Sequence, residues 1–124
     1  MGPGAAAADA PVLLNGRPSW FLRQLASGAF TLLLFDGPSV RELVREVQTE
    51  WEGLAPLEVL LVGDRFVDGA LTVEDAEGLL AQRFDGEPET AYLIRPDQHV
   101  CARWRSPNAP AIRGAGLRAL ALLS

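Results

Sequence analysis

Two apolar runs separated by an amphipathic helix constrain the fold of this chain more than any other feature. Phe30–Phe35 (FTLLLF) and Leu57–Val62 (LEVLLV) are apolar along nearly their whole length. Such runs are typical of strands inside a sheet that is covered on both faces. Between them lies an apolar stripe with helical spacing, at Val40, Leu43, Val44, Val47 and Trp51. Because parallel strands need a long crossover connection, this order predicts two parallel strands joined by a helix.

The ends of this helix carry capping signals. Ser39 and Glu42 have the spacing of a capping box, in which the serine hydroxyl accepts from the N3 amide and the glutamate accepts from the N-cap amide. Gly53 follows the last apolar position and is expected to close the helix.

Shorter patterns predict the N-terminal elements. The run Val12–Leu14 ends at Asn15-Gly16, which is a turn signal, so a small edge hairpin is expected here. Ser19–Leu25 has the spacing of a short helix with Ser19 as its N-cap.

Two more helices are expected in the second half of the chain. Thr72–Asp75 begins the first, with Asp75 in the capping-box position. Its inner stripe consists of Ala76, Leu79, Leu80 and Phe84. The last helix spans Ile112–Leu123, with Asn108 as a candidate cap. Its inward positions are Ile112, Ala119, Leu120 and Leu123.

A hairpin is expected between these two helices. Ala91–Ile94 and Val100–Trp104 flank a turn in which Pro96 fixes its own backbone angle. Strict alternation places Val100, Ala102 and Trp104 on one face of the second strand. The other face then carries Cys101, Arg103 and Arg105. The hairpin adds antiparallel strands, so the complete sheet is expected to be mixed.

The segment Arg83–Pro88 (RFDGEP) followed by Thr90–Arg105 (TAYLIRPDQHVCARWR) resembles the C-terminal end of FAD-dependent aromatic-ring monooxygenases. Within that family it resembles the 3-(3-hydroxyphenyl)propionate hydroxylase-like and phenol hydroxylase-like flavoproteins. The resemblance extends from about Asp9 to the last helix and covers none of the family's catalytic part. It implies that residues 11–124 form a thioredoxin-like domain, an α/β three-layer fold with a mixed central sheet, a closing β-hairpin and a C-terminal helix. Residues 1–10, rich in Gly, Ala and Pro, are then a linker or disordered tail.

The same resemblance implies a parent enzyme that uses FAD and NAD(P)H to activate oxygen and hydroxylate a phenolic ring. No residue of that mechanism can be carried over, because the sequence has no G-x-G-x-x-G motif after a strand. No catalytic, cofactor-binding or metal-binding residue is therefore assigned to this chain.

Thioredoxin-like redox chemistry is not expected either. In such proteins the reactive thiolate follows the central strand at a helix N-terminus, where the helix dipole lowers the thiol pKa. That place is Asp36-Gly37-Pro38-Ser39 in this sequence, and it contains no cysteine. Redox proteins of the thioredoxin fold also have a cis-proline just before the strand that opens the hairpin. In this sequence that position falls on Glu89 or Thr90, and Pro88 is nearby but offset. We therefore expect a redox-inactive domain.

Two isolated residues have a simple structural reading and a functional alternative. Cys101, the only cysteine, is expected to be a small, buried or half-buried side chain in the middle of the strand. Alternatively it is a sensor thiol assisted by Arg103 and Arg105. His99, the only histidine, is expected in the hairpin turn, without companions at zinc-binding spacing. The spacing of an acidic stretch does not match that of a calcium-binding loop, so its side chains are expected to be solvated. The stretch consists of Asp64, Asp68, Glu74, Asp75 and Glu77.

Five residues form a candidate interface because arginine and aromatic side chains are enriched in interface cores. They are Tyr92, Arg95, Arg103, Trp104 and Arg105. The alternative is that they are ordinary surface positions whose stems cover apolar area. As an interface, they would contact the FAD-binding and substrate domains of the parent chain or a second subunit.

Composition limits the remaining functions. The 124 residues carry a net charge of −5 and have a pI near 4.8, which argues against nucleic acid as a main partner. The apolar runs are too short to span a membrane and the start lacks a signal-peptide pattern, so a cytoplasmic location is expected. The sequence favours a non-catalytic domain of an FAD-dependent aromatic hydroxylase that serves packing or subunit contact. A stand-alone thioredoxin-like binding module is the second hypothesis, and a small thiol enzyme using Cys101 is the third.

Overall fold

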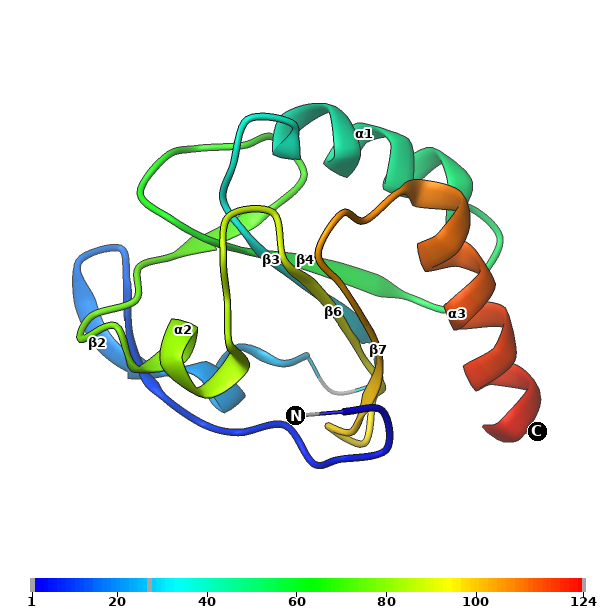
Figure 1. The fold of residues 1–124 in the computed structure, drawn as a ribbon, viewed down its shortest axis with the longest axis horizontal. Coiled ribbons are helices and arrows are strands. Elements are labelled where there is room, and N and C mark those ends of the chain that lie inside the picture. Colours follow the sequence, from blue (N-terminus) through cyan, green and yellow to red (C-terminus); the bar gives the residue numbers. More distant parts are fainter. Residues whose placement is uncertain (1, 27, 124) are drawn as a thin grey trace.

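The structure, a computed structural model, describes residues 2–26 and 28–123 (Figure 1). In chain order its elements are β1 (Pro11–Leu14), β2 (Arg17–Trp20), the 3-10 helix η1 (Phe21–Gln24), β3 (Phe30–Phe35), α1 (Val40–Glu50), β4 (Leu57–Val62), β5 (Leu71–Val73), α2 (Leu79–Phe84), β6 (Ala91–Ile94), β7 (Val100–Trp104) and α3 (Ala109–Leu123). None of these helices, within the described residues, combines the length and apolar character needed to cross a membrane.

The main sheet is mixed, as predicted, and has the strand order β5-β4-β3-β6-β7. β4 runs parallel to β3 and β5, whereas β6 runs antiparallel to β3 and β7. β3 lies at the centre, and all six of its residues are buried. The two apolar runs therefore form the adjacent parallel strands that the sequence predicts, and the hairpin closes the sheet on the other side.

Helical elements cover both faces of this sheet and give three layers (Figure 1). α1 and α3 cover one face, where they pack against Leu32 and Leu34 of β3. α2, η1 and the β1–β2 hairpin cover the other, where Leu33 and Phe35 lie. Because successive side chains of a strand point to opposite faces, the single run FTLLLF contributes to both halves of the core.

α1 confirms the predicted apolar stripe but not its predicted cap. All five stripe residues are buried, namely Val40, Leu43, Val44, Val47 and Trp51. The Ser39 side chain makes no capping hydrogen bond, and the Ser39 amide donates instead to Oε2 of Glu89 at 2.5 Å. The capping-box prediction is therefore wrong, because a carboxylate from the segment before β6 takes the role expected of Glu42.

The helix expected to begin at Thr72 is shorter and begins later. Thr72 and Val73 belong to β5, which extends the sheet beside β4. α2 spans only Leu79–Phe84. The Asp75 carboxylate still serves the helix start, since it accepts hydrogen bonds from the backbone amides of Leu80 and Ala81 at 3.0 and 2.9 Å. Ala76, expected on the inner stripe, precedes the helix and is exposed.

The N-terminal hairpin is confirmed, but the helix expected at Ser19–Leu25 is wrong in type and extent. Ser19 lies within β2 and pairs with Val12 of β1. Only the 3-10 helix η1 follows, and it buries Phe21 completely. Pairing with β1 keeps the backbone of Ser19 extended, which removes it from an N-cap position.

The first described residues lie against the edge of β7. The Gly4 amide donates to the Val100 carbonyl and the Val100 amide donates to the Ala5 carbonyl, at 2.8 and 2.9 Å. The Ala7 amide donates to the Gln98 carbonyl at 2.8 Å. This part of the expected linker is thus hydrogen-bonded to the domain. The domain boundary at residue 11 stays a prediction.

A bulge in β7 overturns the predicted alternation of that strand. Ile94 pairs with Val100 but Leu93 pairs with Ala102, so Cys101 has no counterpart on β6. An extra residue on one strand reverses the side-chain alternation at that point. Val100 therefore packs on the α2 side of the sheet, whereas Cys101 and Ala102 both pack on the α1–α3 side.

α3 has the predicted cap and most of the predicted inner face. The Asn108 side-chain oxygen accepts a hydrogen bond from the Ala111 amide at 2.9 Å, so the helix begins at Ala109 and not at Ile112. Ile112 and Ala119 are buried, and Leu120 is partly buried against the same core. The side chain of Leu123, also expected to point inward, lies outside the described part of the structure.

Candidate functional site

The junction between β3 and α1 is the place where a thioredoxin-like protein would carry its thiolate, and here it carries an ion pair. Both carboxylate oxygens of Asp36 accept hydrogen bonds from the Arg65 guanidinium at 2.8 Å. These bonds lower the pKa of the Asp36 carboxyl, and partial burial opposes the shift. Arg65 also donates to the Gly37 carbonyl at 3.2 Å. The pair therefore joins the end of β3 to the loop between β4 and β5.

Glu89 occupies the other half of this junction. Its backbone has φ +71°, a region that L residues rarely adopt, and its side chain reaches the amide of Ser39 before α1. A Cβ atom at Gly37 would come closer than 3.0 Å to the Glu89 side chain. No peptide bond among the described residues is cis. Where a redox protein of this fold has a proline beside a thiol, this chain has a carboxylate beside a helix N-terminus.

The only thiol in the chain lies elsewhere and is poorly suited to nucleophilic chemistry. Cys101 is partly buried in the β7 bulge, and burial raises its pKa to about 11. A thiol with such a pKa is almost entirely protonated at neutral pH, whereas the thiolate is the reactive form. The predicted grouping of Cys101 with Arg103 and Arg105 is wrong, because the bulge turns the thiol to the opposite side of the sheet.

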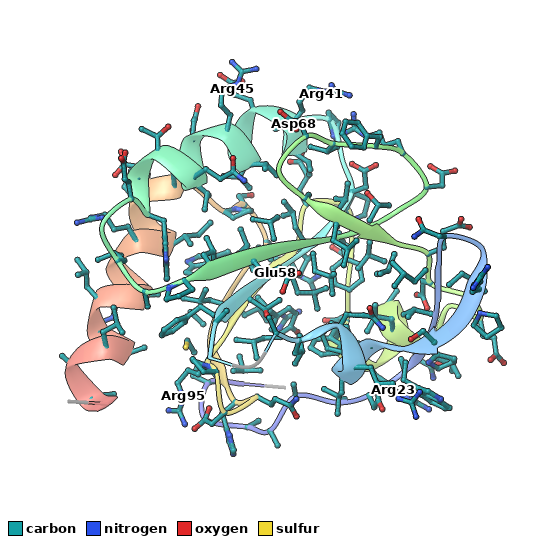
Figure 2. All side chains as sticks on the ribbon, turned by 180° about the vertical axis from the view of Figure 1, so that it is seen from behind. Arg23, Arg41, Arg45, Glu58, Asp68 and Arg95 are labelled. Atoms are coloured by element: carbon teal, nitrogen blue, oxygen red, sulfur yellow. The ribbon has the colours of Figure 1, made fainter. Side chains whose placement is uncertain are left out.

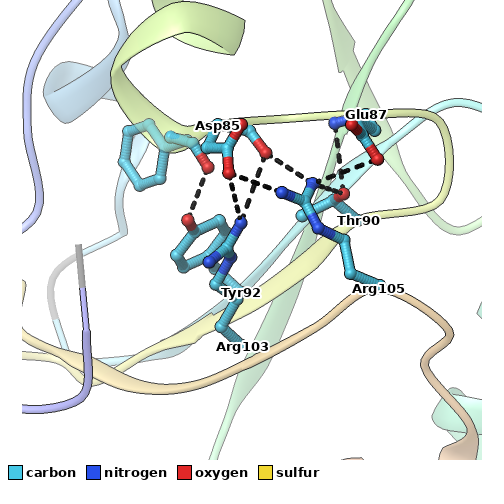
Figure 3. A network of polar contacts seen from close by, with 7 residues as sticks. Asp85, Glu87, Thr90, Tyr92, Arg103 and Arg105 are labelled. Carbon is cyan, nitrogen blue, oxygen red and sulfur yellow. Dashed lines mark hydrogen bonds and ion pairs between the residues drawn. The ribbon is translucent and has the colours of Figure 1, made fainter.

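Tyr92, Arg103 and Arg105 do come together, around Asp85 at the end of α2 (Figure 3). Arg103 and Arg105 donate to Oδ2 of Asp85 at 2.9 and 2.5 Å. The hydrogen bond from Arg103 and the charge of Arg105 lower the pKa of the Asp85 carboxyl. Arg103 also lies over the Tyr92 ring, with 5.6 Å from its guanidinium carbon to the ring centroid.

This network satisfies the last carbonyl groups of α2. The buried Tyr92 hydroxyl donates to the Phe84 carbonyl at 2.5 Å. Arg105 donates to the Asp85 carbonyl at 2.6 Å. Asp85 itself adopts the left-handed conformation, with φ +48°. Helix ends leave carbonyls without intrahelical partners, and cations near a C-terminus also interact favourably with the helix dipole. Three residues predicted to meet a partner are therefore engaged in capping a helix of their own chain.

The other two predicted interface residues lie apart from this network. Trp104 is partly buried against the core beneath α1 and α3. Arg95 lies at the hairpin turn, where it donates to Asp97 at 3.0 and 2.5 Å. Figure 2 shows Arg95 at the opposite end of the molecule from Arg41 and Arg45 of α1. The structure thus distributes the five residues over three places, and their role as an interface stays a prediction.

The remaining candidates are consistent with their simpler interpretation. His99 is partly exposed beside the turn, and its Nδ1 lies 3.1 Å from the Asp97 carbonyl oxygen. Among the described residues, no three His, Cys, Asp or Glu side chains are grouped so that they could hold a metal ion. Of the acidic stretch, Asp75 acts at the start of α2, as described above.

Sequence patterns did not reveal Asp85, Glu89 or the Asp36–Arg65 pair as site residues. Asp85 lies 18 and 20 residues from its arginine partners, and Glu89 lies 50 residues from Ser39. The one local signal was Asp85-Gly86, a dipeptide that marks turns.

Comparisons with known proteins find solved structures that are similar to this chain. No protein family model and no curated protein matches the chain. The solved structure of the flavin-dependent monooxygenase PieE in complex with FAD and substrate is similar, with 26% identity and a TM-score of 0.70 over 96% of this chain and 20% of PieE. Aklavinone-11 hydroxylase with FAD and aklavinone has 23% identity and a TM-score of 0.67 over 96% of this chain and 21% of its own.

A third similar structure matches over nearly the whole length of both chains. Peroxidoxin BcpB from Mycobacterium tuberculosis has 19% identity and a TM-score of 0.67, over 100% of this chain and 99% of its own. These similarities, with that to a thioredoxin-like protein, show the predicted thioredoxin-like α/β fold. The chain spans about a fifth of the length of the flavin monooxygenases it matches.

Proposed function

We propose that this chain is a non-catalytic, redox-inactive domain of an FAD-dependent aromatic hydroxylase and serves packing or subunit contact. The observation that carries the proposal is the similarity to PieE, which covers nearly all of this chain but only 20% of PieE. FAD and NAD(P)H would be bound by the other domains of such a parent. No described residue of this chain is assigned to either cofactor.

The non-catalytic part of the proposal is supported by the two places where thiol chemistry could occur. The N-terminus of α1 meets the Glu89 carboxylate and carries no thiol. Cys101 has a pKa raised to about 11 by burial. Both features oppose a reactive thiolate at neutral pH.

A stand-alone binding module of the same fold is the second candidate. The alignment with peroxidoxin BcpB favours it, because that alignment covers 99% of the other chain. A protein of this size can therefore have this fold without additional domains. In this reading the chain would bind a partner and would still lack redox chemistry.

The size of the native polypeptide distinguishes the two candidates. An antibody against this domain would be used to detect it in the source cells. A band several-fold larger than 13.3 kDa is expected if the domain belongs to a hydroxylase. A single band at 13.3 kDa would contradict the proposal and favour the binding module. An insulin-reduction assay of the purified chain tests the redox part, and turnover that disappears in Cys101→Ser would refute it.

A further inference from the structure

A groove between α3 and β7 has no part in the proposed function. Its volume is about 400 Å³, which lies within the range of small-molecule sites, about 300–1,000 Å³. Four residues of α3 line it, namely Ala115, Arg118, Ala119 and Leu122. Their spacing of i, i+3, i+4 and i+7 places them on one face of the helix. We call this hollow the α3–β7 groove.

The other sides of the α3–β7 groove are held in place by the fold. Val100 and Cys101 line it from β7, where the bulge brings the thiol to the α3 side of the sheet. Pro3 and Gly4 line it from the N-terminal segment, and the Gly4 amide donates to the Val100 carbonyl at 2.8 Å. Figure 1 shows the start of the chain, the turn between β6 and β7 and the end of α3 at the same end of the molecule. The groove is therefore formed in the chain without a ligand.

The charged residues that line the groove are both arginines, among the described residues. Arg118 is exposed and makes no ion pair with any residue that the structure describes. Arg95 donates to Asp97 through Nε and Nη2, which holds its guanidinium at the turn and leaves Nη1 without a described partner. Arginine is the side chain best suited to a carboxylate, because its planar fork can donate two parallel hydrogen bonds.

Other hollows on the described surface differ from this groove in charge. Each of four others is lined by at least one acidic side chain, namely Glu46, Glu52, Asp64 and Asp36. Where Arg65 lines a hollow beside Asp36, it is already paired with that carboxylate. The α3–β7 groove is thus a positively lined hollow on a chain with a net charge of −5. Its charge favours an anionic ligand.

The rest of the lining indicates that the ligand also has an apolar part. Leu122 is 82% exposed at the groove, so a large apolar side chain is left in contact with water. Ala115 and Ala119 are small, which leaves room beside it. An inorganic anion would cover little of this apolar surface, whereas a hydrocarbon chain would bury it. No described residue of the lining is aromatic, so the groove offers no ring on which a flat ligand could stack.

We propose that the α3–β7 groove binds a small aliphatic carboxylate. The carboxylate pairs with Arg118 and the hydrocarbon chain lies along Ala115, Ala119 and Leu122. Arg95 adds positive charge at the same groove. This inference goes beyond the proposed function and does not depend on it, because every residue that it uses belongs to this chain.

Titration of the isotope-labelled 124-residue chain with octanoate, followed by amide chemical shifts, tests the proposal. The amides of Cys101, Ala115 and Ala119 should shift together and saturate, whereas amides of β1 and β2 should not move. Octan-1-ol, which has the same chain length but no charge, should bind more weakly. Inorganic phosphate, which has charge but no hydrocarbon chain, should also bind more weakly than octanoate.

Substitutions in the groove give an independent measurement. Arg118→Gln should weaken octanoate binding by about two- to five-fold, the range expected for one exposed ion pair. Arg41→Gln on α1 is the matched control, because Arg41 is also an exposed helical arginine, and it should have no effect. Leu122→Asp should weaken binding as well, since it places a carboxylate beside that of the ligand. Arg118 and Leu122 are exposed, so these substitutions should leave thermal melting nearly unchanged.

Each outcome supports or refutes the groove as a carboxylate site. Saturable shifts that Arg118→Gln weakens and Arg41→Gln does not would support it. The absence of saturable shifts at millimolar octanoate, or shifts spread over the whole chain, would refute it. Octan-1-ol binding as tightly as octanoate, or equal binding by the Arg118→Gln and Arg41→Gln variants, would refute the anion selectivity and with it the proposal. A native polypeptide of 13.3 kDa would refute the proposed function and leave this inference unaffected.

Discussion

Replacing Gly116 with alanine should weaken the packing of α3 on α1, whereas the same replacement at Gly114 should strengthen α3. Both glycines lie in the interior of one helix, two positions apart. A Cβ atom at Gly116 would come closer than 3.0 Å to two ring carbons of Trp51. At Gly114 the nearest atom would be Nη1 of Arg118, at 3.4 Å, which is the end of a flexible side chain.

The surroundings of Trp51 determine the size of the effect. The ring is 5% exposed, its Nε1 donates to the Ala55 carbonyl at 2.6 Å, and it packs edge-on against Phe30 with 5.5 Å between centroids. The ring therefore cannot move aside without losing other contacts, and overpacking of this kind costs about 1–3 kcal/mol. Alanine is favoured over glycine inside a helix by about 0.5–1 kcal/mol, and both variants gain this amount. The difference between the variants is thus about 1–3 kcal/mol.

Urea unfolding followed by tryptophan fluorescence would measure this difference. Gly114→Ala should raise the urea midpoint relative to the unmodified chain. The free energy of unfolding of Gly116→Ala should be lower than that of Gly114→Ala by about 1–3 kcal/mol. Unchanged slopes in all three proteins would show that only stability has changed. Equal stability of the two variants would refute the close packing of α3 on Trp51, and with it the orientation that turns Leu117 outward.

Three further predictions concern single groups. Tyr92→Phe removes the donor to the buried Phe84 carbonyl while keeping the ring, and should cost about 1–3 kcal/mol of unfolding free energy; an unchanged value would contradict the capping role. The hydrogen bonds from Arg95 are the main cause that lowers the pKa of Asp97 to about 2 in the folded chain. The Asp97 carboxylate therefore contributes fully to stability above the unfolded-state pKa of about 4, and this contribution is lost as the pH falls through about 2. Asp97→Asn should make acid unfolding less steep in that window, and identical pH profiles would rule this out. Cys101 should react with iodoacetamide far more slowly at pH 7 than in urea, because burial raises its pKa to about 11, and equal rates would contradict the burial of the thiol.

The parts of the fold predicted from the sequence are those that local periodicity determines. The runs at β3 and β4 are apolar on both faces, and the α1 stripe has a clear helical spacing. Each pattern has a single reading, so the central β-α-β unit could be placed without knowledge of the rest. The closing hairpin then predicted that the sheet is mixed, as observed.

The parts that were predicted wrongly depend on partners distant in the sequence. β5 has only three residues and becomes a strand because Leu71 pairs beside Leu60 of β4, which no local pattern of Thr72 and Val73 announces. The bulge at Cys101 depends on the register in which β7 pairs with β6. One inserted residue reverses every side chain beyond it, so alternation placed the thiol on the wrong side.

The candidate site illustrates the same limit. The sequence could not show that Tyr92 and Arg105 hydrogen-bond the end of α2 and that Arg105 also pairs with Asp85, and the role of these residues in an interface stays a prediction. The inward face of α3 was predicted at Ile112, Ala119, Leu120 and Leu123, and its helical spacing sufficed to place the buried Ile112 and Ala119.

The flavin content of the native polypeptide tests the central claim most directly. The protein would be isolated from the source cells with an antibody against this domain, and its mass and FAD per chain would be measured together. The account predicts a polypeptide several-fold heavier than 13.3 kDa that carries one FAD per chain, while the 124-residue chain alone binds none. A 13.3 kDa polypeptide, or a longer one that binds no flavin, would contradict it.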